Sequence, residues 1–258
     1  MRRVALVLEY EGTSYAGWQR QPQAPTVQAA VEDALARLVQ APCRVVGSGR
    51  TDAGVHALGQ VAHADLDTGL SVRQIRDGLN ALLPPDVAVR AVCDVASDFH
   101  ARRDARGRVY RYLILARPHP SALLRRYAHH VPDPLNLSAM ASAAAALLGR
   151  HDFAAFRITG TPTATTICHV RALRITSRGP LLVVTVAADR FLRQMVRRMV
   201  GSLLLVGRGR LPADAIAPIL ASRDPQRAGP AAPACGLYLV RVVYPPDRLR
   251  VVPEDPVL

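Results

Sequence analysis

The 258-residue chain is half hydrophobic by count, which is the composition of a folded globular protein and excludes an intrinsically disordered chain. No apolar run reaches the roughly 18 residues of a membrane-spanning helix, and Glu9 interrupts the apolar stretch behind the basic start. We therefore expect a cytoplasmic protein with neither a signal peptide nor a membrane partner. The 33 basic residues, all arginine, outnumber 20 acidic ones, and the net charge of +13 indicates a polyanionic partner, although a merely basic, solvated surface remains an alternative.

The first hundred residues predict an α+β lobe. A strand is expected over residues 3–10, followed by a helix that Thr26 can N-cap and whose apolar residues from Val27 onward repeat at helical spacing. The elements predicted next are strands over residues 44–47 and 60–65, a helix from 71 to just before Pro84, and a strand over 87–95. This order is typical of a split βαβ lobe, in which helices cover one face of a mixed or antiparallel sheet.

The second half repeats this order of elements. It predicts a strand over residues 108–116, a helix over 137–148, strands over 170–177 and 181–188, helices over 191–206 and 213–222, and a last strand over 236–244. The fold class is therefore α+β, with two similar lobes of the split βαβ, RNP-like type. We predict an N-terminal lobe over residues 1–104, a C-terminal lobe over 105–245, and a loose, proline-containing tail over 246–258.

The most unusual stretch is the glycine-rich segment from Gly47 to His63, which lies between two predicted strands. Asp52 stands at its centre beside Arg50. A bland interpretation is a turn that Asp52 caps, with Arg50 paired to it on the surface. A metal site is a second interpretation, but the spacing fits no usual ligand pattern; the four residues it would use are Asp52, His56, His63 and Asp65. A phosphate-binding P-loop is excluded because no Gly-Lys-Ser/Thr follows.

The cysteines point to a reducing compartment. Four of them are far apart, and none forms a Cys-x-x-Cys pair; they are Cys43, Cys93, Cys168 and Cys235. This spacing disfavours both a zinc site and a disulfide framework.

A series of motifs decides between these interpretations. The segment Gly49-Arg50-Thr51-Asp52-Ala53-Gly54-Val55-His56, followed by Gly59-Gln60-Val61, resembles the catalytic motif of the tRNA pseudouridine synthase A (TruA) family. Further matches follow in the family's order from residue 3 to about 245; they include Gly17-Trp18-Gln19-Arg20-Gln21, Thr26-Val27-Gln28, Asp98-Phe99-His100-Ala101-Arg102, Arg108-Val109-Tyr110-Arg111-Tyr112, Phe191-Leu192-Arg193-Gln194-Met195-Val196-Arg197 and Gly236-Leu237-Tyr238-Leu239. Arg103 and Pro230 depart from the family pattern at positions outside the inferred chemistry.

The resemblance implies an isomerase that converts uridine to pseudouridine at positions 38, 39 and 40 in the anticodon stem-loop of tRNA. It also implies an active-site cleft between the two lobes, a homodimer that binds tRNA, and no cofactor. Asp52 matches the catalytic carboxylate. A non-catalytic RNA-binding protein on the same fold is the alternative.

Three further residues match substrate-binding positions of the family. Tyr110 would stack on the flipped uracil, whereas Tyr112 on the same strand is expected to pack in the core. Arg197 would keep the catalytic carboxylate ionised, although its helix taken alone favours a solvated basic face. Arg50 would hold the flipped nucleotide or its phosphate.

Overall fold

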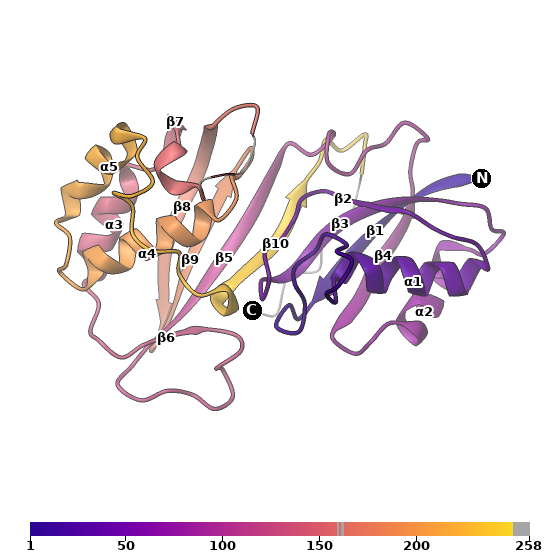
Figure 1. The fold of residues 1–258 in the computed structure, drawn as a ribbon, viewed down its shortest axis with the longest axis horizontal. Coiled ribbons are helices and arrows are strands. Elements are labelled where there is room, and N and C mark those ends of the chain that lie inside the picture. Colours follow the sequence, from indigo (N-terminus) through magenta and orange to yellow (C-terminus); the bar gives the residue numbers. More distant parts are fainter. Residues whose placement is uncertain (159, 161–162, 250–258) are drawn as a thin grey trace. The chain divides into compact units, whose positions relative to one another are not determined.

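The computed structural model describes residues 1–158, 160 and 163–249, and these residues form two compact units. The first unit contains Met1–Arg106 and the described residues from Tyr238 onward, and the second contains Gly107–Leu237. Each unit combines a β-sheet with α-helices (Figure 1), so the predicted α+β class is confirmed. No helix in the described part of the chain is long and apolar enough to span a membrane.

The sheet of the first unit has the strand order β4-β1-β3-β10, with β2 paired to β3. Its pairings are antiparallel except for β10, which runs parallel to β3 through Tyr238 opposite His56 and Leu239 opposite Ala57. The sheet is therefore mixed, as predicted. Its elements are β1 (Arg2–Tyr10), α1 (Val27–Val39), β2 (Val45–Gly47), β3 (His56–Leu66), α2 (Val72–Leu82), β4 (Val87–Asp94) and β10 (Leu237–Val243).

Local sequence signals account for both helices of this unit. The Thr26 side chain accepts a hydrogen bond from the Ala29 amide and caps α1, as predicted. Ser71 and Gln74 form a reciprocal capping box at the start of α2. The two helices lie together on one face of the sheet (Figure 1).

The opposite face of this sheet is covered by chain that has no regular structure. Ala5, Val7 and Val61 pack there against Phe99 and Ala101. Because both faces are covered, β1 is buried continuously from Val4 to Leu8 instead of alternating between buried and exposed positions.

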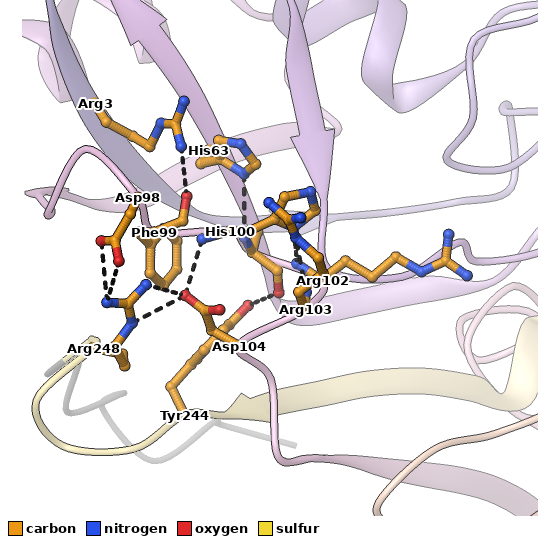
Figure 2. A network of polar contacts seen from close by, with 11 residues as sticks. Arg3, His63, Asp98, Phe99, His100, Arg102, Arg103, Asp104, Tyr244 and Arg248 are labelled. Atoms are coloured by element: carbon orange, nitrogen blue, oxygen red, sulfur yellow. Dashed lines mark hydrogen bonds and ion pairs between the residues drawn. The ribbon is translucent and has the colours of Figure 1, made fainter.

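Figure 2 shows how polar contacts tie the last described residues to this face. The Arg248 guanidinium pairs with Asp98 at 3.1 Å and with Asp104 at 2.7 Å, and the Tyr244 hydroxyl donates to the Ala101 carbonyl. The Ala101 amide in turn donates to Nδ1 of the buried His63 at 3.2 Å. The prediction of a loose tail is therefore wrong for residues 246–249, and the rest of that segment, 250–258, lies outside the described residues.

The sheet of the second unit has the order β5-β9-β8-β7, all antiparallel, with the short β6 parallel to β5. The predicted strands and helices are present, with β6, β7 and three 3₁₀ turns in addition. The elements are β5 (Gly107–Ala116), β6 (His129–Val131), α3 (Leu137–Ala145), β7 (Gly149–Asp152), η1 (Ala154–Phe156), β8 (Ile167–Arg178), β9 (Leu181–Ala188), α4 (Met195–Gly207), η2 (Ala213–Ala215), α5 (Ile216–Ser222) and η3 (Ala234–Gly236).

Several boundaries differ from those expected from the sequence; for example, β3 begins at His56 rather than at 60, and α5 at Ile216 rather than at 213. Helix α4 begins at Met195 rather than at 191, because Gln194 has a left-handed backbone with φ of 61° that cannot continue a helix backwards. The last strand is expected in the second lobe, but from Tyr238 onward it groups with the first unit, where it pairs with β3 and its Val242 packs near Phe99.

Candidate active site

Asp52 lies in the loop that joins β2 to β3, and the backbone of this loop is held from several sides. The Thr51 carbonyl accepts from the Trp18 amide at 3.1 Å, and the Asp52 carbonyl accepts from the Val55 amide at 3.2 Å. The Thr51 hydroxyl shares a buried hydrogen bond of 2.8 Å with the Tyr10 hydroxyl. Asp52 itself is half-buried, so its carboxylate is carried by a fixed backbone and is still partly accessible.

The segment from Gly12 to Gly17 packs directly against this loop. Gly17 has φ of +99°, and a Cβ atom built there would stand 2.5 Å from the Thr51 carbonyl oxygen. Only glycine allows both the backbone conformation and the close approach. The first residue of the Gly17-Trp18-Gln19-Arg20-Gln21 motif must therefore be glycine so that this segment can lie against the loop that carries Asp52.

Two buried polar side chains hold the start of the loop. The Ser48 hydroxyl and Gln60 Oε1 are 2.7 Å apart, and Gln60 Nε2 donates to the Gly49 carbonyl at 3.0 Å. Gln60 is fully buried in β3. The sequence alone assigns no role to Ser48, Gln60 or Tyr10. The available signal was Gln60 among the apolar residues 57–62 of β3, because a buried amide needs internal hydrogen-bond partners.

Arg50 lies in the same loop as Asp52 and is exposed. Its Nε donates to Gln19 Oε1 at 3.0 Å, which ties the guanidinium to the segment around Trp18. An exposed guanidinium of this kind suits an anionic ligand.

The histidine of the motif is a structural residue. His56 is 1% exposed, accepts from the Gly12 amide at 3.0 Å through Nδ1, and stacks on Tyr238 at 4.7 Å between ring centroids. Among the described residues, no three His, Cys, Asp or Glu side chains are grouped so that they could hold a metal ion, which disfavours the metal interpretation of this segment.

The two other predicted residues lie in the second unit. Tyr110 is half-buried on β5, and its ring meets Phe191 edge-on at 5.0 Å and 85°. Tyr112 on the same strand is fully buried, donates from its hydroxyl to the Pro233 carbonyl at 2.8 Å, and has its pKa raised by burial. Tyr112 is thus a core residue, as predicted, while Tyr110 keeps part of its ring accessible.

Arg197 lies in the first turn of α4 and is half-buried rather than on a solvated face. Its Nε donates to the Ala232 carbonyl at 2.7 Å, and the Ala232 amide donates back to the Arg197 carbonyl at 3.0 Å. The sequence suggests that Gly201 leaves room for the Arg197 side chain. Gly201 instead makes room for the backbone of Pro230, since a Cβ atom there would overlap the Pro230 carbonyl oxygen.

Asp52 and Arg50 thus belong to the first unit, and Tyr110 and Arg197 to the second. Comparison with known proteins adds a direct finding. The family model described as tRNA pseudouridine synthase matches residues 6–104 and 143–245. The chain belongs to the tRNA pseudouridine synthase family. Asp52, Arg50 and Arg197 lie inside the matched ranges of that family, whereas Tyr110 lies between them.

Curated members of the family resemble the chain over nearly its whole length. A protein of Geobacter sulfurreducens named tRNA pseudouridine synthase A is 48% identical over 244 residues, covering 95% of this chain and all of the relative. Proteins of the same name from Methylobacterium nodulans and Myxococcus xanthus are 48% and 46% identical, covering 95% and 96% of this chain and 97% and 95% of their own lengths. The resemblance to this family is therefore not confined to one motif.

Proposed function

We propose that the protein isomerises uridine to pseudouridine in tRNA, at positions 38, 39 and 40 of the anticodon stem-loop, and that Asp52 is its catalytic carboxylate. The family membership and the name shared by the full-length relatives support the reaction class. The observation that carries the residue assignment is the half-buried Asp52 on a loop that Trp18 holds through the Thr51 carbonyl and Tyr10 through the Thr51 hydroxyl.

The reaction rearranges one molecule. The N1–C1′ bond of the uridine breaks, the uracil turns, a C5–C1′ bond forms, and the C5 proton is lost as N1 gains one, so atoms and electrons balance without a co-reactant. A carboxylate can serve this sequence by attacking C1′ or C6, or by stabilising positive charge at C1′. A fixed carboxylate needs no reorganisation as that charge develops.

We assign the accompanying roles to Tyr110, Arg197 and Arg50. The partly accessible ring of Tyr110 offers a flat surface on which a flipped uracil can stack. Arg197 is proposed as a substrate-binding residue, which is the role that the family resemblance implies for its place in the helix motif. The exposed Arg50 guanidinium, tied to Gln19 through Nε, would bind the phosphate of the flipped nucleotide.

Substitution of Asp52 by asparagine tests the catalytic assignment, because it keeps the shape and removes the charge. Unmodified tRNA transcript is incubated with each variant, and pseudouridine is mapped by carbodiimide treatment and primer extension. Asp52→Asn should bind tRNA and form no pseudouridine, while the exposed Asp67→Asn should behave as wild type. Pseudouridine formation by Asp52→Asn at a near wild-type rate would contradict the assignment. A wild-type protein that binds tRNA without modifying it would instead favour the RNA-binding alternative.

We further propose a homodimer that binds tRNA mainly through arginine–phosphate contacts and works in the cytoplasm. The net charge of +13 supports binding to a polyanion such as tRNA. No disulfide joins the four cysteines, all of which lie in the described part of the chain, as suits a reducing compartment. Light scattering at micromolar concentration should give twice the chain mass, and a monomeric mass would contradict the dimer.

A further inference from the structure

Helix α1 carries a buried carboxylate that the chemistry above does not use. Glu32 is 7% exposed and lies on the side of α1 that faces the sheet. Its Oε1 accepts from the Val45 amide at 3.0 Å and from Gln28 Nε2 at 2.9 Å, and its Oε2 accepts from Arg20 Nη1 at 3.0 Å. A buried carboxylate is costly unless it is paired and hydrogen-bonded, and Glu32 meets both conditions.

Gln28, one turn earlier in α1, connects Glu32 to the segment 17–20. Its Nε2 donates to Glu32 and to the Val45 carbonyl at 3.0 Å, which orients the amide so that Oε1 accepts from the Arg20 amide at 3.0 Å. The first amides of α1 complete the attachment: Val27 donates to the Gly17 carbonyl at 3.2 Å and Gln28 to the Trp18 carbonyl at 3.0 Å. Amides that a helix start usually leaves to solvent or a cap therefore hold this segment.

The segment 17–20 in turn holds the loop that carries Asp52. The Trp18 amide donates to the Thr51 carbonyl at 3.1 Å, next to Asp52 in the chain, and Gln19 accepts from Arg50 at 3.0 Å. The segment thus lies between α1 on one side and the catalytic loop on the other. Trp18 takes part on both sides, since its carbonyl accepts from the Gln28 amide of α1 and its amide donates to the Thr51 carbonyl of the loop.

We infer that Glu32 is a positioning residue for Asp52, which it acts on through Arg20, Gln28 and the segment 17–20. This inference rests on the proposed function of Asp52. The ion pair joins the buried Glu32 to the exposed Arg20 and gives little net stability, but with the hydrogen bonds around it, it specifies one arrangement of the groups it joins. Catalysis is sensitive to such an arrangement, since a displacement of about 1 Å can lower the rate a hundredfold.

Glu32→Gln tests this role with a side chain of the same size. The glutamine carbonyl can still accept from the Val45 amide, but its NH₂ group then points its donors at the Arg20 guanidinium, so the link to the segment 17–20 fails. We expect kcat to fall about ten- to a hundredfold, with KM for tRNA changed less than threefold. Hydrogen exchange of the Trp18 amide should speed up as its bond to Thr51 loosens.

Asp33→Asn is the matched control, because Asp33 is the exposed second partner of Arg20, at 3.1 Å and 66% exposed. This variant removes the same charge from the same guanidinium and should keep kcat within twofold. Gln28→Met is a second variant that spares the Glu32–Arg20 pair and removes the amide link, and it should lower kcat in the same way. It also serves if Glu32→Gln does not fold.

Three results would overturn the inference while wild type remains active. They are an unchanged kcat in the folded variants, an equal fall of kcat in Asp33→Asn, or a rise of KM for tRNA with kcat unchanged. The last two would indicate a direct contact between Arg20 and tRNA. Failure of the proposed function is distinguishable, because wild type itself would then form no pseudouridine.

Discussion

Replacing Gly201 by alanine should disturb the hydrogen bonds between Arg197 and Ala232 without changing either residue. The added Cβ on α4 would overlap the Pro230 carbonyl oxygen. The segment around Pro230 must therefore move away from α4 by more than about 1 Å. Three hydrogen bonds join that chain to α4: the two between Arg197 and Ala232, and one from the Gly229 amide to the Ser202 hydroxyl at 2.8 Å.

The magnitude follows from these contacts. The two neutral hydrogen bonds contribute about 1 kcal/mol each and the one from the Arg197 guanidinium about 2 kcal/mol, so their loss costs about 4 kcal/mol. Alanine recovers about 1 kcal/mol because it is the better residue inside a helix. The net loss is about 3 kcal/mol, which for a chain of this size lowers Tm by about 6–12 °C.

Thermal unfolding followed by circular dichroism measures this shift, and pseudouridine mapping measures the effect on activity. We expect Gly201→Ala to lose both stability and turnover, because Arg197 loses its partner Ala232. Gly69→Ala is the control, since a Cβ at Gly69 meets no neighbour within 4 Å. A Gly201→Ala variant that is as stable as wild type, or more stable by the helix-propensity gain, would refute the reasoning.

The remaining predictions concern the first unit and the charge. Gly17→Ala should lower kcat at least tenfold, because its Cβ would push the segment 17–20 off Thr51, and Gly69→Ala should not. Burial, with the charge of Arg3 adding to it, lowers the pKa of His63 to about 4. The unfolded chain therefore binds this proton first, and stability should fall by up to about 3 kcal/mol as pH drops from about 6.5 to 4. Urea unfolding at several pH values should show this fall reduced in His63→Gln, whose carbonyl can still accept from the Ala101 amide; an unchanged pH profile would remove His63 as the cause. Affinity for tRNA should fall about a thousandfold from ~50 to ~200 mM salt if about six phosphates are neutralised, and a flat response would show that the arginines do not bind phosphate.

The regular elements followed closely from local chemistry. Thr26 and Ser71 mark helix starts because their side chains satisfy the first amides of α1 and α2, and the apolar periodicity between such signals predicted the main strands and helices. The short β6 and β7 escaped prediction because three or four residues carry too little periodicity. Asp52 and Arg197 could be singled out only through motif resemblance. Spacing alone was also consistent with a surface turn at Asp52 and a solvated helix face at Arg197.

The sequence by itself determined the main helices and strands, the family resemblance and the identity of the candidate catalytic carboxylate, because these depend on neighbours within a few residues or on an ordered motif. Only the tertiary structure decided which side chains support it. Glu32 lies in an ordinary amphipathic helix pattern, and its burial depends on Arg20 and on Val45, which reach it from separate segments. Likewise Gly201 meets the Pro230 carbonyl, and Arg248 meets Asp98 and Asp104, across separations that no local pattern encodes. Such contacts arise when packing brings distant backbone together, and for that reason the supports of the site appeared only in the folded molecule.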